Sequence, residues 1–258
     1  MFCPFCEIEV SEFHQNSHVV PDWLYKLSFK ENKNLKSYGL DIQEEEIALK
    51  QSSLKGPFIC RDCETVFGDP EGYARLVFGD ETNHSSIPNV ANADVRKVNT
   101  QFGLHEGYEM IGLDFKKLKK FVLGVILKGH MAKTGLTKDL LGDKHFIRMR
   151  EIYLEDHEGD DLIYPIFVFK FNENQPFWNM VSQPVRTKSK EGLNLISFKG
   201  GGYEFNVNVQ SHPLTREEAE FRFRKEGRLL MLKAVQNLVA IREFLEKAKK
   251  LKADRWGS

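Results

Sequence analysis

Four cysteines in two Cys-x-x-Cys pairs are the residues of this chain best suited to metal chemistry. The first pair is Cys3 and Cys6, the second is Cys60 and Cys63, and the chain has no other cysteine. Each pair places two sulfurs on one side of a tight turn, and two pairs complete the four thiolate ligands of a tetrahedral zinc site. We therefore expect a structural Zn²⁺ site that is closed to water and contributes folding free energy.

Two alternatives to this ligand set come from the same residues. The cysteines can form structural disulfides, but the N-terminus lacks the basic and apolar regions of a signal peptide, so we expect a cytoplasmic protein. In a reducing compartment, paired cysteines favour metal over disulfide. His14 can replace a cysteine as ligand, although four thiolates already fill the shell. The most apolar stretch, 121–127, is too short to cross a bilayer, so no membrane partner is expected.

A histidine between the two pairs has the clearest catalytic chemistry. His18 begins a His-Val-Val-Pro tetrapeptide, and a neutral imidazole can accept a proton near pH 7. After the second pair, the carboxylates of Glu64, Asp69 and Glu71 offer the oxygen ligands that hard cations such as Mg²⁺ prefer. The residues alone also allow a plainer interpretation. In it, His18 hydrogen-bonds the zinc-binding turn or the backbone, and Asp69 and Glu71 belong to a solvated helix face.

The order of these residues resembles a known family. A Cys-x-x-Cys pair, His-Val-Val-Pro at 18–21, a second pair and the stretch 64–71 (Glu-Thr-Val-Phe-Gly-Asp-Pro-Glu) look like the zinc-clasped HNH endonucleases of the ββα-metal, treble-clef type. The resemblance covers residues 1–80. It implies a bacterial or phage-associated protein in which His18 is the general base for phosphodiester hydrolysis of DNA. It also implies a catalytic Mg²⁺ or Mn²⁺ ion that stabilises charge on the phosphate and the leaving oxygen.

Three positions differ from the catalytic pattern of that family. Ser17 stands where the family has an Asp or Glu metal ligand, and Glu64 stands where an Asn is usual. On the following helix Glu71 can ligate a metal, but the matching histidine is missing. The leading hypothesis is therefore metal-dependent cleavage with His18, Glu64 and Glu71 as site residues. Two others stay open: a degenerate module that binds nucleic acid or a protein without cleavage, and a ligand-sensing α+β domain with a structural zinc finger.

Charge supports nucleic-acid binding only where it is locally concentrated. Lys and Arg number 37, and Asp and Glu also number 37, so the net charge is zero. The clearest basic group is formed by Lys116, Lys117, Lys119 and Lys120, which the helical spacing of 118–126 places opposite the apolar face. We expect these lysines to contact DNA phosphates. The alternative is an ordinary solvated helix face.

The elements that must position these residues indicate an α+β protein with three parts. Residues 1–80 are expected to form the HNH-like treble-clef zinc domain, 81–112 a linker or irregular segment, and 113–258 an α+β domain with a small antiparallel sheet. The helix after the second cysteine pair is predicted to start near Pro70, because proline is tolerated in a first turn. Thr215 and Glu218 form a capping box that predicts a long C-terminal helix to about residue 250.

The remaining elements follow from apolar periodicity. Helical spacing predicts helices over 22–29, 116–126 and 140–153. An apolar run predicts a buried strand over 162–171. Alternation predicts a hairpin of strands 193–198 and 203–209, with a glycine turn between them.

Overall fold

A computed structural model describes ten parts of the chain, which together form a mixed α/β protein. The described residues are 1–28, 55–79, 94–100, 103–133, 140–155, 160–171, 180–188, 194–209, 214 and 216–233. The helices are α1 (Asp22–Ser28), α2 (Arg61–Phe78), α3 (Phe115–Ala132), α4 (Asp143–Leu154) and α5 (Arg216–Phe221). None of the helices in these parts has an apolar run long enough to cross a membrane.

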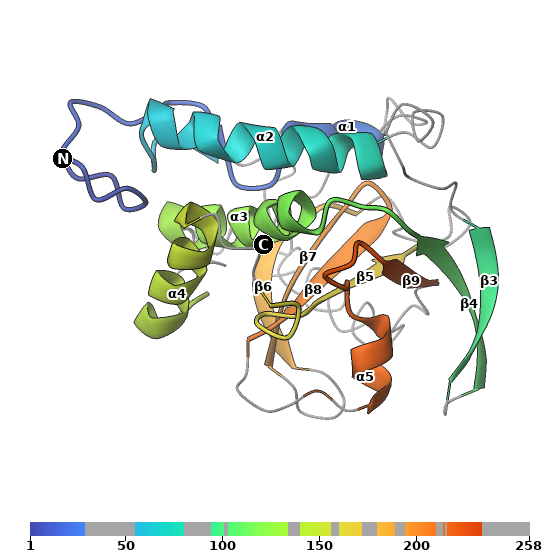
Figure 1. The fold of residues 1–258 in the computed structure, drawn as a ribbon. Helices are drawn as coiled ribbons and strands as arrows, with labels where there is room; N and C mark the ends of the chain where they lie inside the picture. The colour runs from blue at the N-terminus through green and yellow to red at the C-terminus, as the bar shows by residue number, and fades with distance from the viewer. Residues whose placement is uncertain are drawn as a thin grey trace, which may run out of the picture.

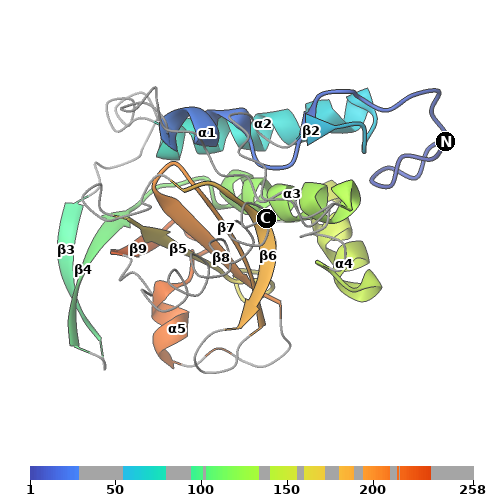
Figure 2. The same cartoon turned by 180° about the vertical axis from the view of Figure 1, so that it is seen from behind.

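Nine strands in the described residues form two sheets. They are β1 (Ser17–His18), β2 (Lys55–Gly56), β3 (Asp94–Thr100), β4 (Gly103–Met110), β5 (Ile166–Lys170), β6 (Ser182–Lys188), β7 (Asn194–Gly200), β8 (Tyr203–Asn208) and β9 (Leu229–Lys233). β1 and β2 form a small antiparallel pair, and the other seven form one sheet in the order β3-β4-β9-β5-β8-β7-β6. Neighbours in the large sheet are antiparallel except β5 and β9, which are parallel. Helices α1, α2 and α3 lie on one side of this sheet, and α5 lies beside β9 (Figure 1, Figure 2).

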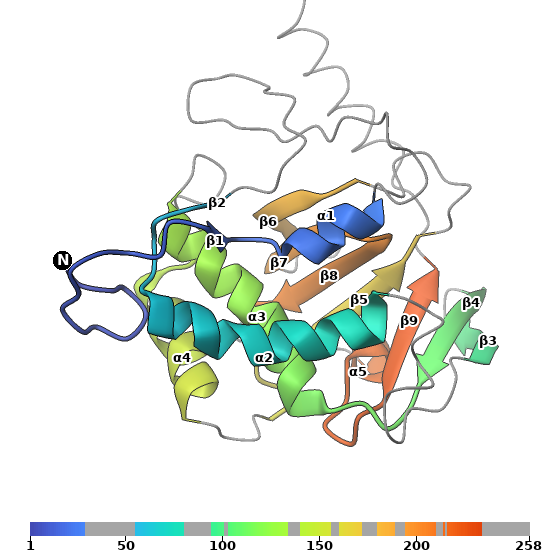
Figure 3. The same ribbon diagram turned by 90° about the horizontal axis from the view of Figure 1, so that it is seen from above.

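Phenylalanine side chains join the helices to the sheet. On α3, Phe121 contacts Phe205 of β8 with ring centroids 5.7 Å apart, and on α2, Phe78 contacts the same ring at 5.2 Å. Phe198 of β7 stacks on Phe205 at 4.8 Å. Seen from above, α2 crosses over α3, and α1 lies over β7 and β8 (Figure 3). The buried residues form one hydrophobic core that runs from the N-terminal turn to the sheet.

The β7–β8 hairpin confirms the predicted glycine turn, which packs against α1. Gly201 has φ +61° and Gly202 has φ +83°, the left-handed backbone that a two-residue hairpin turn requires. The Gly201 N–H donates to the Ser28 hydroxyl at the end of α1, at 2.9 Å. A Cβ atom at Gly201 would lie 3.0 Å from Leu27, so the turn leaves room only for glycine beneath α1.

Helix α2 starts earlier than predicted. It begins at Arg61, directly after the N-cap residue Cys60, and Pro70 lies inside it rather than in its first turn. Proline inside a helix removes one backbone hydrogen bond at a cost of about 3 kcal/mol. Burial of Pro70 together with Phe67 and Ala74 offsets this cost, because that face of α2 belongs to the core.

The segment 81–112 is not simply a linker. Within it, β3 and β4 form a hairpin whose second strand pairs with β9, with Tyr108 opposite Met231. The polar composition hid these strands, since their stability comes from tertiary pairing rather than from a run of apolar residues. Residues 80–93 of this segment lie outside the described residues.

The predicted long C-terminal helix is wrong over its first half. Helix α5 ends at Phe221, the chain turns through Gly227 at φ +79°, and β9 begins at Leu229. The run Leu-Leu-Met-Leu has good helix formers, but β9 lies between β4 and β5 and is buried there. Sheet pairing therefore outweighs local helix preference. Thr215 of the expected capping box and residues 234–258 lie outside the described residues.

Candidate metal centre and the adjacent ionic cluster

The four cysteines come together as a metal-binding group. Their sulfur atoms all lie within 4.8 Å of one another. Cys3 Sγ and Cys63 Sγ are 3.7 Å apart, and Cys6 Sγ and Cys60 Sγ are 3.9 Å apart. Four sulfurs at about 2.3 Å from a tetrahedral zinc ion lie about 3.8 Å from one another. A disulfide needs about 2.0 Å, so the geometry is compatible with a structural zinc and not with disulfides.

Two different local structures present the sulfurs. Cys3 and Cys6 lie on a tight turn closed by the bond from Cys3 N–H to Ile8 O, 3.0 Å. Cys60 is the N-cap of α2 and Cys63 lies in its first turn, where the helix dipole favours thiolates. The Cys60 N–H donates to Cys3 Sγ at 3.4 Å and so links the two turns.

The alternative ligand His14 is outside this group. Its backbone N–H bonds the Ile59 carbonyl at 2.8 Å, which places it next to the second pair without its ring joining the sulfurs. Among the described residues, the four cysteines are the one set of three or more His, Cys, Asp or Glu side chains placed to hold a metal ion.

A buried ion cluster forms between α2, which also carries Cys63, and α3. Glu64 and Glu71 of α2 both point to Lys128 of α3, whose side chain is fully buried while each carboxylate side chain is 23% exposed. The Lys128 ammonium forms an ion pair with Glu71 and lies 3.9 Å from Glu64 Oε1. Burial raises the pKa of Glu71, an effect that Lys128 opposes. The two predicted catalytic carboxylates thus converge, but on a lysine.

His18 lies beside this cluster. It pairs with Lys55 across the antiparallel strands β1 and β2 and is half-buried. Burial lowers its pKa; Asp22 and Glu64 oppose this, while Lys128 reinforces it. The lowered pKa favours the neutral imidazole, and of the two carboxylates that the sequence associates with His18, Glu64 lies close enough to act on it. Ser17 is buried and its hydroxyl donates to the His14 carbonyl at 3.4 Å.

Two polar atoms of the cluster have no hydrogen-bond partner in the described part of the chain. They are the Tyr153 hydroxyl and Glu64 Oε2, both buried. Burial and three carboxylates, with Glu71 the strongest, raise the pKa of Tyr153, so it stays protonated as a donor. Sequence reasoning missed both Tyr153 and Lys128. Lys128 had a detectable signal, since it follows Phe121 at the i+7 position and so lies on the apolar face of its helix.

The predicted DNA-contacting lysines do not form one exposed surface. Lys119 is buried, and its ammonium donates to the carbonyls of Asp160 at 2.7 Å and Ile163 at 2.6 Å. The other three lysines are partly exposed. Lys117 pairs with Asp69 at 3.2 Å, and Lys120 lies over the Tyr153 ring at 5.5 Å. The prediction for Lys119 is therefore wrong.

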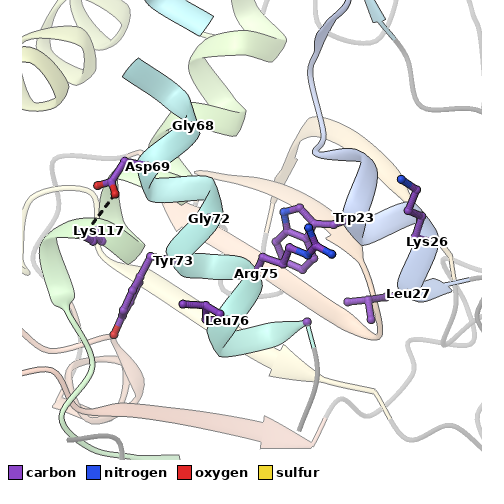
Figure 4. Close-up of a pocket in the computed structure, with 11 residues that line it drawn as sticks. Trp23, Lys26, Leu27, Gly68, Asp69, Gly72, Tyr73, Arg75, Leu76 and Lys117 are labelled. Atoms are coloured by element: carbon purple, nitrogen blue, oxygen red, sulfur yellow. Dashed lines mark hydrogen bonds and ion pairs between the residues drawn. The ribbon is translucent and has the colours of Figure 1, made fainter. Parts of the chain in front are cut away.

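A groove lies between α1 and α2 (Figure 4). Its volume is about 990 Å³. Trp23 and Tyr73 line it on opposite sides, and Gly68 and Gly72 of α2 also line it.

No family model, no curated protein and no solved structure matches the chain.

Proposed function

We propose that the N-terminal part of this protein is a zinc-binding module of the HNH-like, treble-clef type, which binds nucleic acid without metal-dependent cleavage. Three parts support the treble-clef assignment: a cysteine turn at 3–6, the antiparallel pair of β1 and β2, and α2 with the second cysteine pair at its start. Helix α1 lies between β1 and β2 in the chain. In this proposal the four cysteines hold one structural Zn²⁺, which supplies folding free energy and has no open coordination position.

The position of Lys128 between Glu64 and Glu71 is the main observation in favour of a module that does not cleave. A catalytic divalent ion would need Glu64 and Glu71 as ligands, yet both converge on a fully buried ammonium. A metal ion at that position would have to displace the Lys128 ammonium, whose side chain is fully buried and has no contact with water. Since the ammonium already offsets one of the two negative charges, the gain from binding Mg²⁺ is reduced.

Ser17 supports the same conclusion. The resemblance places a metal-ligating carboxylate at this position, and here a buried serine hydroxyl bonds the backbone. The base position is kept, since His18 is neutral, but the electrophile that would stabilise the transition state has no ligands. Binding does not require a metal ion. Lys55, which pairs with His18, and Arg61, the first residue of α2, are exposed and offer cations to phosphate groups.

The described part of the sheet favours nucleic-acid binding over the ligand-sensing alternative. That alternative needs a cavity among the phenylalanine-rich strands, but Phe198, Phe205 and Phe121 pack ring against ring there.

The test measures binding and cleavage on the same zinc-loaded protein. Fluorescence anisotropy with single- and double-stranded DNA should show binding that weakens with salt, and Lys55→Ala with Arg61→Ala should lower the salt slope by about 2. Supercoiled plasmid with Mg²⁺ or Mn²⁺ should stay intact. Nicking that is lost in His18→Ala and kept in the matched variant His14→Ala would establish a nuclease and refute the proposal. Absence of any DNA or RNA binding would refute it equally.

A further inference from the structure

A second cluster of polar side chains lies around His145, apart from the cysteine centre. His145 is in the first turn of α4, and its Nδ1 lies 3.0 Å from the hydroxyl of Tyr164. Tyr164 is only 6% exposed, so its hydroxyl has a fixed position against the ring. Burial raises the pKa of Tyr164, which keeps this hydroxyl protonated.

Two arginines add positive charge to this cluster. The Arg148 guanidinium lies 5.9 Å from the centre of the Tyr164 ring, and Arg186 of β6 lies close enough to act on His145. Both arginines are exposed, and neither has an ion pair among the described residues. Burial lowers the pKa of His145, and Arg186 and Arg148 lower it further. The charged groups that act on this histidine are therefore both cations, and they favour its neutral form.

We propose that His145, Arg148 and Arg186 form a binding site for a phosphoryl group. The Tyr164 hydroxyl donates to His145 Nδ1, which leaves the proton of the neutral ring on Nε2. Nε2–H then donates to a phosphate oxygen, while the two guanidinium groups supply charge and further donors. Tyr164 is a positioning residue, because it acts on the ligand only through the ring.

This inference does not depend on the HNH-like module, since it uses α4, β6 and the loop before β5. Its failure would leave the proposed function unchanged. Equally, the site can bind inorganic phosphate even if the N-terminal module binds no nucleic acid.

The test follows the His145 ring during a phosphate titration of the full zinc-loaded chain. In ¹H–¹³C spectra the ring signal, assigned by its loss in His145→Ala, should shift and saturate with inorganic phosphate. The double variant Arg148→Ala, Arg186→Ala should weaken binding at least about tenfold. Arg75→Ala removes an equally exposed arginine from α2 and should change nothing. Tyr164→Phe should change the ¹⁵N tautomer pattern of His145 and weaken binding severalfold.

Two results would overturn the site. One is a His145 signal that stays unchanged through tens of millimolar phosphate. The other is equal phosphate affinity in the double arginine variant and the wild type. Competition then identifies the source of the phosphoryl group: we expect a short thymidine oligomer to displace phosphate from His145. Displacement by phosphatidylglycerol vesicles and not by the oligomer would refute a nucleic-acid source.

Discussion

Replacing Lys128 by methionine tests the ion cluster on which the proposed function depends. Methionine keeps an unbranched chain of similar length but removes the ammonium, which leaves Glu64 and Glu71 facing each other. Removing one partner of a buried pair costs about 3–5 kcal/mol. Each carboxylate side chain is 23% exposed and reaches some water, so the lower end, about 3 kcal/mol, applies. That corresponds to a loss of about 6–12 °C in Tm for a domain of this size.

The loss should depend on pH. Burial already raises the pKa of Glu71, and Lys128 partly opposes this rise, so the variant has a still higher folded-state pKa. A group whose pKa is raised by folding contributes stability at low pH and loses it as pH rises through the folded value. The deficit of Lys128→Met should therefore be larger at about pH 8 than at about pH 5.

A double-mutant cycle in urea measures the coupling. Glu71→Gln should destabilise the wild type but not Lys128→Met, giving a coupling energy above about 1 kcal/mol. Lys117→Met is the matched control, because its pair with Asp69 is solvent-exposed and should cost less than about 1 kcal/mol. If Glu71→Gln costs the same in both backgrounds, or Lys128→Met is as stable as the wild type, the carboxylates do not depend on Lys128. The argument against a catalytic metal then fails.

Two further predictions concern the metal and the hairpin turn. Cys60→Ser should reduce bound zinc, measured by mass spectrometry, from about one ion per chain to substoichiometric levels and lower Tm, since metal binding supplies folding energy; full zinc content in the variant would exclude the cysteine site. Gly201→Ala should cost about 1 kcal/mol or more in urea unfolding, because it has positive φ and a Cβ there meets Leu27. Gly72→Ala, in α2 with nothing near its Cβ, should instead stabilise by about 0.5–1 kcal/mol, and the opposite order would contradict both arguments.

Structure is predicted best from the sequence where the residue types allow few local geometries. Two Cys-x-x-Cys pairs have few geometries other than a shared metal site, and the sulfur positions agree with it. The glycine turn at 200–202 was also predictable, because consecutive residues with positive φ need glycine between alternating strands. In both cases a local pattern determines the local structure.

Prediction fails where a distant partner decides the structure. β9 reads as helix from its own residues and becomes a strand only because β4 and β5 border it. Lys119 cannot be told from the partly exposed Lys117 and Lys120 by residue type, yet Lys119 is buried, as is Lys128 farther along α3. Their binding partners are 41 or more residues away in the chain. The i+7 spacing from Phe121 could have indicated that Lys128 is buried, but no local window contains the groups that bind either lysine.

The place of Lys128 also explains why the family resemblance cannot by itself assign an activity. The resemblance involves residues 1–80, whereas the cation between Glu64 and Glu71 comes from α3, after that segment. A motif confined to one segment can keep its metal-binding cysteines and its histidine. Another segment can still supply a side chain, here Lys128, that occupies the position a catalytic metal ion would need. Whether the carboxylates hold Mg²⁺ or an ammonium is thus decided by the packing of α2 on α3, and the Lys128 cycle measures that choice directly.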